Sequence, residues 1–285
     1  MVIKSSEFST QERPGLKIKK GDLVWASPAV YHWPLAPLAL SEQVIGQKIA
    51  HNENGMVKPS DPLLKLTKIA LIAALTAGGD MGQLKTALIE GLEAGLTINE
   101  IKEVLIHTSA YAGFPRALNG LNAFIAVLDE REKAGLKDEY GPLASPVVMG
   151  KSRYEYGQDV LAKLRDPAFK PGPAGSPKPI GPVPRYETFT PIIETLLKEH
   201  IFADLFSRDV LDYESREIAT VGVISNLKGA NEQLRAHIGL ALNQGVTAEQ
   251  LKDIFQEMGP RLGQERADNA LAVLRQVMES PKNNP

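Results

Sequence analysis

One segment of this chain occurs twice, 150 residues apart, and that repeat limits the folds the chain can adopt. The first copy reads QLKTALIEGLEAGLTINEIKEVL from Gln83, and the second reads QLRAHIGLALNQGVTAEQLKDIF from Gln233. The register holds without a gap as far as Asn119 and Asn269. Upstream, TKIAL at 67–71 faces REIAT at 216–220 with one residue inserted. A repeat of this kind predicts two copies of one supersecondary unit.

Each copy carries the start and stop signals of helices. Gly95 suits the left-handed position that follows a helix, and Thr97 with Glu100 forms the capping box of the next one. The second copy has the equivalent signals at positions 245, 247 and 250. Between these signals apolar residues recur at helical spacing, as Leu84 and Leu88 illustrate, and no segment has a convincing strand pattern. We therefore predict an all-α fold, built as a tandem duplication of one helical repeat.

The segment YAGFPRALNG at 111–120 marks a corner between two helices. Gly113 can end the helix that carries His107, and Pro115 fits the first turn of the next helix. We expect Phe114 to be buried at this corner.

Proline content divides the chain between the two copies. Eight of the 20 prolines fall between Pro167 and Pro191, a density that favours an extended, semi-rigid connector over helix or sheet. We therefore predict a first repeat at 61–165, a connector at 166–190 and a second repeat at 191–285. Residues 1–60 are less regular, and we predict an N-terminal extension there that covers the first repeat.

Composition excludes several classes of site. The chain contains no cysteine, so it has no disulfides, thiolate nucleophiles or metal sites with thiolate ligands. None of the five histidines has a second histidine at the spacing of a helical metal site, and we expect neither a metal nor another cofactor. A formal charge of −2 gives no reason to expect a nucleic-acid or membrane partner. No apolar run could cross a bilayer and no secretory signal is visible, which favours a cytoplasmic location.

Three segments carry a resemblance to a known family. EVLIHTSAYAGFPRALNGL, SRDVLDYESREIATVGV and QLRAHIGLALNQGVTAEQL resemble the carboxymuconolactone decarboxylase family, which shares its fold with alkylhydroperoxidase D. The resemblance covers residues 61–135 and 191–280 and is to the two-repeat, fused members. Its motifs are specific for the fold and much less so for the reaction, because one fold can support several functions.

The peroxidase branch of that family uses a Cys-x-x-Cys pair, then a His after three further residues, and a Glu upstream. If His237 is the matching histidine, the cysteines should stand at Ala230 and Gln233. Neither position is cysteine, and reduction of a peroxide by thiols needs both an attacking and a resolving thiol. The resemblance therefore does not imply a thiol peroxidase here.

The second repeat retains the other members of the pattern, Glu217 and His237. The first repeat has Lys68 and Ala87 at the equivalent positions, so it lacks both. With the family pattern, Glu217 and His237 are predicted to form a proton-transfer pair. Read alone, Glu217 could be a helix cap and His237 a structural hydrogen bonder.

The first repeat holds a different pair of polar groups, His107 and Tyr111, one turn apart on one helix face. Their equivalents in the second repeat are Glu257 and Arg261. We take His107 and Tyr111 as candidate catalytic donors, although Tyr111 could simply anchor the corner. This division fits one composite pocket between the repeats, and it equally fits one active and one decayed copy.

The resemblance implies a lyase that removes CO2 from a small unsaturated lactone or keto acid by acid–base chemistry, without a cofactor. The same residues would equally suit a related proton shift, such as double-bond isomerisation of a small acid. Arg216 and Arg235 are the candidates for binding the substrate carboxylate. The alternative is a non-catalytic member that binds a small ligand or serves as an assembly subunit. Because single-repeat members form hexamers, we expect three of these fused chains to assemble into a homotrimer.

Overall fold

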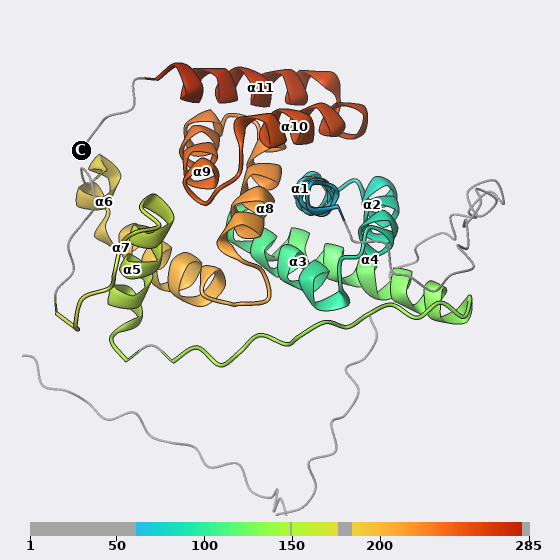
Figure 1. Cartoon of the computed structure of the whole chain (residues 1–285), viewed down its shortest axis with the longest axis horizontal. Coiled ribbons are helices and arrows are strands. Elements are labelled where there is room, and N and C mark those ends of the chain that lie inside the picture. The colour runs from blue at the N-terminus through green and yellow to red at the C-terminus, as the bar shows by residue number, and fades with distance from the viewer. Residues whose placement is uncertain (1–60, 149, 176–183, 281–285) are drawn as a thin grey trace, which may run out of the picture. The chain divides into compact units, whose positions relative to one another are not determined.

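A computed structural model describes residues 61–148, 150–175 and 184–280. These ranges contain eleven α-helices and one π-helix and no β-strand, which confirms the predicted all-α class (Figure 1). The predicted role of the extension at 1–60 lies outside the described residues. In the described part of the chain, no helix combines the length and the apolar character needed to span a bilayer.

Each repeat folds into four helices. The first repeat comprises α1 (Pro62–Gly78), α2 (Met81–Glu93), α3 (Ile98–Ala112) and α4 (Phe114–Lys133). The second comprises α8 (Tyr213–Ser225), α9 (Asn231–Asn243), α10 (Ala248–Leu262) and α11 (Gln264–Glu279). Helices α9 and α10 reproduce the bounds of α2 and α3 150 residues later, so the tandem repeat in the sequence is a repeat in the structure.

The predicted helix signals are present. Both capping boxes form, and the glycines before them adopt left-handed backbone angles, with φ of 87° at Gly95 and 103° at Gly245. Gly113, with φ of 81°, ends α3, and Pro115 lies in the first turn of α4. The burial predicted for Phe114 is wrong, because its side chain is 63% exposed. The corner needs only the glycine and the proline.

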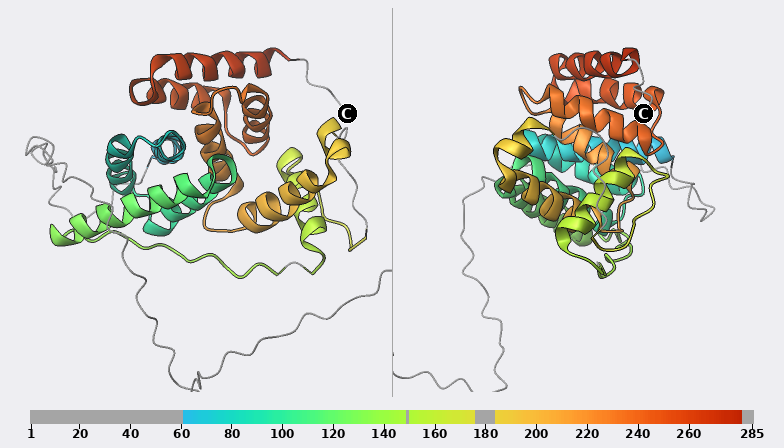
Figure 2. Two further views of the ribbon diagram at one scale, coloured as in Figure 1. Left: turned by 180° about the vertical axis from the view of Figure 1, so that it is seen from behind. Right: turned by 90° about the vertical axis from the view of Figure 1, so that its left-hand side faces the viewer.

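The two repeats pack through their first helices. Helix α1 lies against α8, while α3 of the first repeat contacts α8 and α10 of the second contacts α1. Figure 2 shows α10 and α11, in dark orange and red, side by side beyond α8. Helix α1 is apolar on nearly every side, as its buried run from Ile69 to Ala77 shows, because it is enclosed by both repeats. A side-chain atom added at Gly222 would lie 2.4 Å from the Ala70 carbonyl oxygen, so this crossing depends on glycine.

A separate helical segment lies between the repeats in the sequence. It comprises α5 (Arg153–Arg165), α6 (Arg185–Phe189), α7 (Pro191–Leu196) and the π-helix η1 (Leu197–Phe206). Helix α5 packs against η1 over a small core of its own, made by Val160, Leu164, Phe202 and Phe206. The predicted connector at 166–190 thus contains helix α6. Helix α5, which was assigned to the first repeat, packs instead against η1, which precedes the four helices of the second repeat.

Side chains from α9 fix the end of α5. The Asn243 amide donates to the Arg165 carbonyl at 2.8 Å, and the Gln244 amide donates to the Leu164 carbonyl at 2.9 Å. Carbonyls in the last turn of a helix have no partner within that helix, so these amides satisfy them. The contacts attach the segment α5–η1 to the second repeat.

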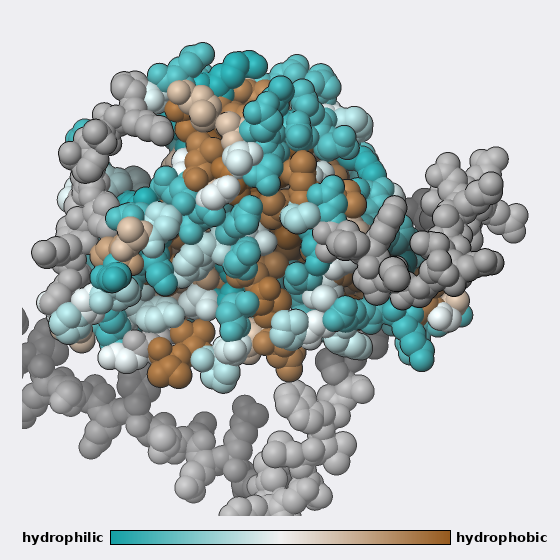
Figure 3. Space-filling model, in the orientation of Figure 1, coloured by the Kyte–Doolittle hydropathy of each residue, from teal (hydrophilic) through white to brown (hydrophobic). Residues whose placement is uncertain are grey.

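Apolar side chains also reach the surface. Phe114, Leu118 and Ile125 form an exposed stripe along α4, and Phe189 and Ile192 are exposed on α6 and α7. On the face drawn in Figure 3, apolar groups in brown reach the surface between polar ones in teal. An exposed apolar stripe on a helix is typical of a surface that another chain covers.

Candidate functional site

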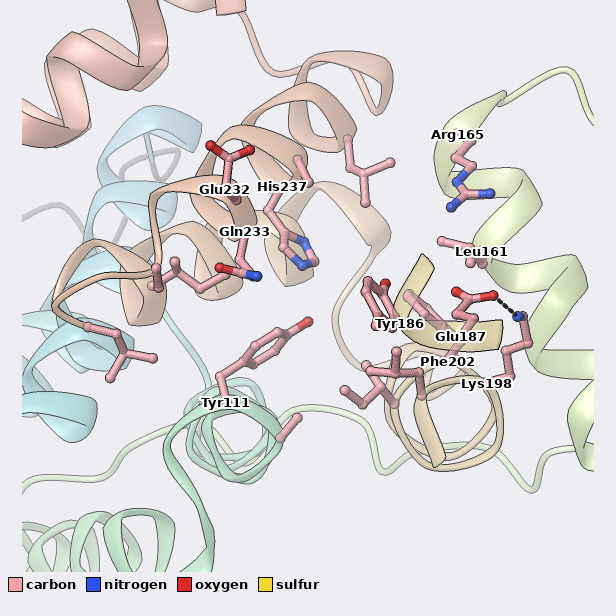
Figure 4. Close-up of a pocket in the computed structure, with 18 residues that line it drawn as sticks. Tyr111, Leu161, Arg165, Tyr186, Glu187, Lys198, Phe202, Glu232, Gln233 and His237 are labelled. Atoms are coloured by element: carbon pink, nitrogen blue, oxygen red, sulfur yellow. Dashed lines mark hydrogen bonds and ion pairs between the residues drawn. The ribbon is translucent and has the colours of Figure 1, made fainter. Parts of the chain in front are cut away.

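A pocket of about 720 Å³ lies where the repeats meet the segment α5–η1. Helices α3, α8 and α9 supply one part of its lining, and α5, α6 and η1 supply the rest (Figure 4). The lining is mainly apolar. Polar side chains stand on two sides, with Tyr111 and His237 on one and Lys198 and Glu187 on the other. A largely apolar hollow with a few convergent polar groups is the usual form of a small-molecule site.

The Glu217 carboxylate lies against His237. Its Oε2 is 2.7 Å from Nδ1 of the imidazole, and the Glu217 side chain has no exposed surface. A carboxylate at Nδ1 holds the proton on that nitrogen and leaves Nε2 to exchange a proton elsewhere. His237 itself lines the pocket. The arrangement can therefore hold and deliver a proton at the pocket wall.

The other carboxylate oxygen of Glu217, Oε1, is buried and has no hydrogen-bond partner among the described residues. A buried unpaired acceptor costs free energy, and such groups concentrate at functional sites. Glu217 therefore resembles a functional carboxylate more than a helix cap. Asp212, not Glu217, caps α8 through its side chain.

Tyr111 comes to this pair from the other repeat. Its ring stands edge-on to the His237 ring, with centroids 5.6 Å apart and an interplanar angle of 89°. Figure 4 shows the Tyr111 hydroxyl pointing into the pocket below His237. Burial, and then the negative charge of Glu217, raise the pKa of Tyr111 far above its ordinary value. Tyr111 thus stays protonated and can donate a hydrogen bond to a ligand oxygen.

His107 is not a lining residue of the pocket. It is fully buried, its Nε2 is 2.8 Å from the Thr220 hydroxyl, and that hydroxyl is 3.4 Å from the Tyr111 oxygen. Burial, and then the charge of Arg216, hold the pKa of His107 well below its ordinary value. His107 is therefore neutral, and it contacts the Thr220 hydroxyl, which donates to the Arg216 carbonyl at 2.9 Å, so the structure does not place His107 in direct reach of a ligand.

Neither arginine predicted to bind substrate lines the pocket. Arg216 is fully buried, and its guanidinium donates to Glu103 at 3.0 Å and to the Arg208 carbonyl at 2.6 Å. Arg235 donates to the Gln276 side chain at 2.7 Å. Both guanidinium groups hydrogen-bond within the protein, although the buried Nε of Arg235 has no partner among the described residues.

The position related to this pocket by the repeat is filled by charged groups. Glu90 on α2 accepts a hydrogen bond from Lys68 at 2.8 Å and forms an ion pair with Arg261 of α10. Burial opposes ionisation of Glu90, but the hydrogen bonds from both cations lower its pKa. Ala87 replaces the histidine at this position. The Glu–His pair thus occurs at one of the two related positions, and its pocket is composite, with Tyr111 from α3 and His237 from α9.

Sequence reasoning missed the second side of the pocket. Leu161, Tyr186, Lys198 and Phe202 line it from the segment between the repeats, part of which was predicted to be a connector. The capping box at the start of α5, formed by Ser152 with Glu155, was the available signal.

The two positions at which the peroxidase pattern has cysteine lie at the pocket wall. Ala230 and Gln233, where that branch would carry its cysteines, both line the pocket beside His237. This pocket is therefore lined by His237 and, where the peroxidase pattern has cysteine, by Ala230 and Gln233.

Comparison with known proteins agrees with this architecture. The sequence model of the carboxymuconolactone decarboxylase family matches residues 50–126 and again residues 193–276, together more than half of the chain. No curated protein matches the chain. The first match extends into α4, and the second runs from α7 through η1 into α11, so each match includes most of one four-helix repeat. The chain belongs to the carboxymuconolactone decarboxylase family.

Proposed function

We propose that this protein is a lyase that catalyses decarboxylation, or a related proton shift, of a small unsaturated lactone or keto acid. The observation that carries the proposal is the contact of 2.7 Å between the buried Glu217 carboxylate and His237, at the wall of a mainly apolar pocket. Such a pair suits a reaction in which one proton is delivered to carbon.

The substrate class supplies its own electron sink. In a lactone acid whose carboxylate stands on a saturated ring carbon next to a C=C bond that is conjugated to the lactone carbonyl, the bond from that ring carbon to the carboxylate breaks and CO2 leaves. The electron pair moves into the carbonyl and forms a dienolate. One proton from the protein then restores a C–H bond, so the net reaction consumes one proton and releases CO2.

Tyr111 and His237 at the pocket wall, and Glu217 behind His237, have separate roles in this reaction. Tyr111, which stays protonated, donates a hydrogen bond to the oxygen where negative charge develops. His237 delivers the proton to carbon, and Glu217 orients the imidazole through its Nδ1. The apolar lining favours loss of neutral CO2 over retention of a desolvated carboxylate.

The test compares His237→Gln and Glu217→Gln with His200→Gln, a matched control on η1 that does not line the pocket. Turnover is measured as CO2 release from carboxymuconolactone and related unsaturated lactone and keto acids, and deuterium uptake at carbon is followed in D2O. Loss of a general acid costs about 10²–10⁴-fold in rate, so we expect His237→Gln to lose at least a hundredfold without a matching loss of thermal stability.

Three results would contradict the proposal. They are full turnover by His237→Gln, a loss accounted for by unfolding, and no turnover or deuterium uptake by the wild-type protein on any of these acids. The last would leave a non-catalytic member of the family that binds a small ligand.

A further inference from the structure

Lys198 is a buried cation on the pocket wall across from Tyr111 and His237. It is 8% exposed, lies on the π-helix η1 and lines the pocket (Figure 4). A buried ammonium is costly unless it is paired, and π-helical turns are frequent at functional sites. The charge of Lys198 must therefore be balanced by groups around it.

Two carboxylates contact Lys198, and they do so unequally. Glu194 accepts a hydrogen bond from Nζ at 2.5 Å, whereas Glu187 lies at 3.4 Å, beyond the usual range for such a bond. An ammonium has three donors, and among the described residues these are its two hydrogen-bond acceptors. Glu194 does not line the pocket, but Glu187 does. Lys198 thus has a short hydrogen bond to Glu194, outside the pocket lining, and a longer contact with Glu187 on the pocket side.

We propose that Lys198 binds the carboxylate of an anionic ligand, and that this carboxylate displaces Glu187. Glu187 belongs to α6, a five-residue helix with no buried residue, although its own side chain is only 10% exposed. Its displacement exchanges one carboxylate for another at the same ammonium, so the buried charge of Lys198 stays paired. Glu194 keeps Lys198 in place while the exchange occurs. The ligand then spans the pocket, with its carboxylate at Lys198 and its reacting end at Tyr111 and His237.

This assignment gives the role predicted for Arg216 and Arg235 to a residue that does line the pocket. The placement of the reacting end at Tyr111 and His237 rests on the proposed function. The binding of an anion at Lys198 does not. Lys198 is a specificity-determining residue, because a charge-assisted hydrogen bond distinguishes a carboxylate from an uncharged group of the same shape. Arg165 stands on the same wall and adds positive charge there.

The experiment measures equilibrium binding of benzoate and of benzamide, its uncharged isostere, to the full chain by ligand-observed NMR. We expect benzoate to bind the wild-type protein about tenfold or more tightly than benzamide, the difference that a charge-assisted hydrogen bond supplies. Lys198→Gln should abolish this preference, and Lys198→Arg should retain it. Glu187→Gln should tighten benzoate binding, because it removes the competing carboxylate.

Lys151→Gln is the matched control. Lys151 is also ion-paired and mostly buried, with Asp159 at 2.5 Å, but it does not line the pocket, so its removal should leave the preference unchanged. Equal affinity for benzoate and benzamide, no benzoate binding by the wild-type protein, or a preference that survives in Lys198→Gln would each overturn the assignment. If Lys198→Gln does not fold, the assignment is overturned when Glu187→Gln binds benzoate no more tightly than the wild-type protein does. Because both probes are unreactive, failure of the proposed lyase activity leaves this result intact.

Discussion

Replacing Glu103 by Gln should destabilise the protein more than any comparable change at its surface. The Glu103 carboxylate joins the two repeats: it accepts hydrogen bonds from Arg208 at 2.7 and 3.0 Å and from Arg216 at 3.0 Å. Its side chain is 4% exposed, and that of Arg216 is 0% exposed. The amide of Gln would leave the Arg216 charge buried without a counter-ion. Breaking a buried pair in this way costs about 3–5 kcal/mol of the free energy of unfolding.

The second ion network supplies the control. Glu90 occupies a similar place between Lys68 and Arg261, but these three side chains are 17–26% exposed. Water can replace a lost partner there, so Glu90→Gln should cost about 1 kcal/mol or less. For a domain of this size, about 1 kcal/mol shifts the midpoint of thermal unfolding by about 2–4 °C. The expected shifts are therefore about 6–20 °C for Glu103→Gln and at most about 2–4 °C for Glu90→Gln.

Acid should remove the difference between wild type and Glu103→Gln. Burial opposes ionisation of Glu103, but the hydrogen bonds from Arg208 and Arg216 prevail and lower its pKa. A group with a lowered folded-state pKa stabilises the fold fully above its unfolded value, near about 4.3, and loses that contribution as the pH falls through the folded value. Urea unfolding at a series of pH values measures this. Equal losses for Glu103→Gln and Glu90→Gln at pH 7, or a Glu103 difference that persists in strong acid, would refute the reasoning.

Three further predictions concern the interface, the histidine behind Tyr111 and the assembly. Gly222→Ala should lower the free energy of unfolding by about 1–3 kcal/mol, because the added methyl meets the Ala70 carbonyl. Gly239→Ala, with open space around it, should raise the free energy of unfolding by about 0.5–1 kcal/mol. Urea unfolding that ranks the two variants oppositely would contradict the packing argument. Because the folded-state pKa of His107 is lowered, stability should decline as the pH falls below about 6.5 by up to about 1.4 kcal/mol per unit, and His107→Gln should lack this part of the slope in the same titration. Given the apolar stripe on α4, we expect light scattering to return three chains, and the mass of one 31.0 kDa chain would contradict this.

Local signals in the sequence were sufficient for the repeat and its helix ends. The capping boxes and the glycine at each helix end are chemical features of the residues themselves, so their positions could be predicted from the sequence. The pairing of Glu217 with His237 came from the family pattern, since 20 residues separate them and their contact depends on how α8 packs on α9.

Features that depend on packing between distant helices could not be predicted. Arg216 was predicted to bind a substrate carboxylate, yet α8 packs against both α1 and α3, and the Arg216 guanidinium is enclosed with Glu103. Phe114 reads as a core residue, but the corner turns it outward. Tyr186 and Glu187 on the far wall were missed because many prolines suggested a connector, although a helix can begin beside a proline, as α6 and α7 do. Lys198 was placed in the second repeat, and nothing local to it indicates that it lines a pocket.

The joining of the two repeats in one chain lets their related positions diverge. Two identical copies paired about the same interface would place every substitution at both positions at once, so a histidine in one site would also appear in the other. In this chain a change in α9 is not copied into α2, and His237 can stand at one position while Ala87 stands at the other. The ion network of Lys68, Glu90 and Arg261 can then join the repeats without removing the Glu–His pair. The fused chain therefore carries a Glu–His pair at one of the related positions and an ion network that joins the repeats at the other.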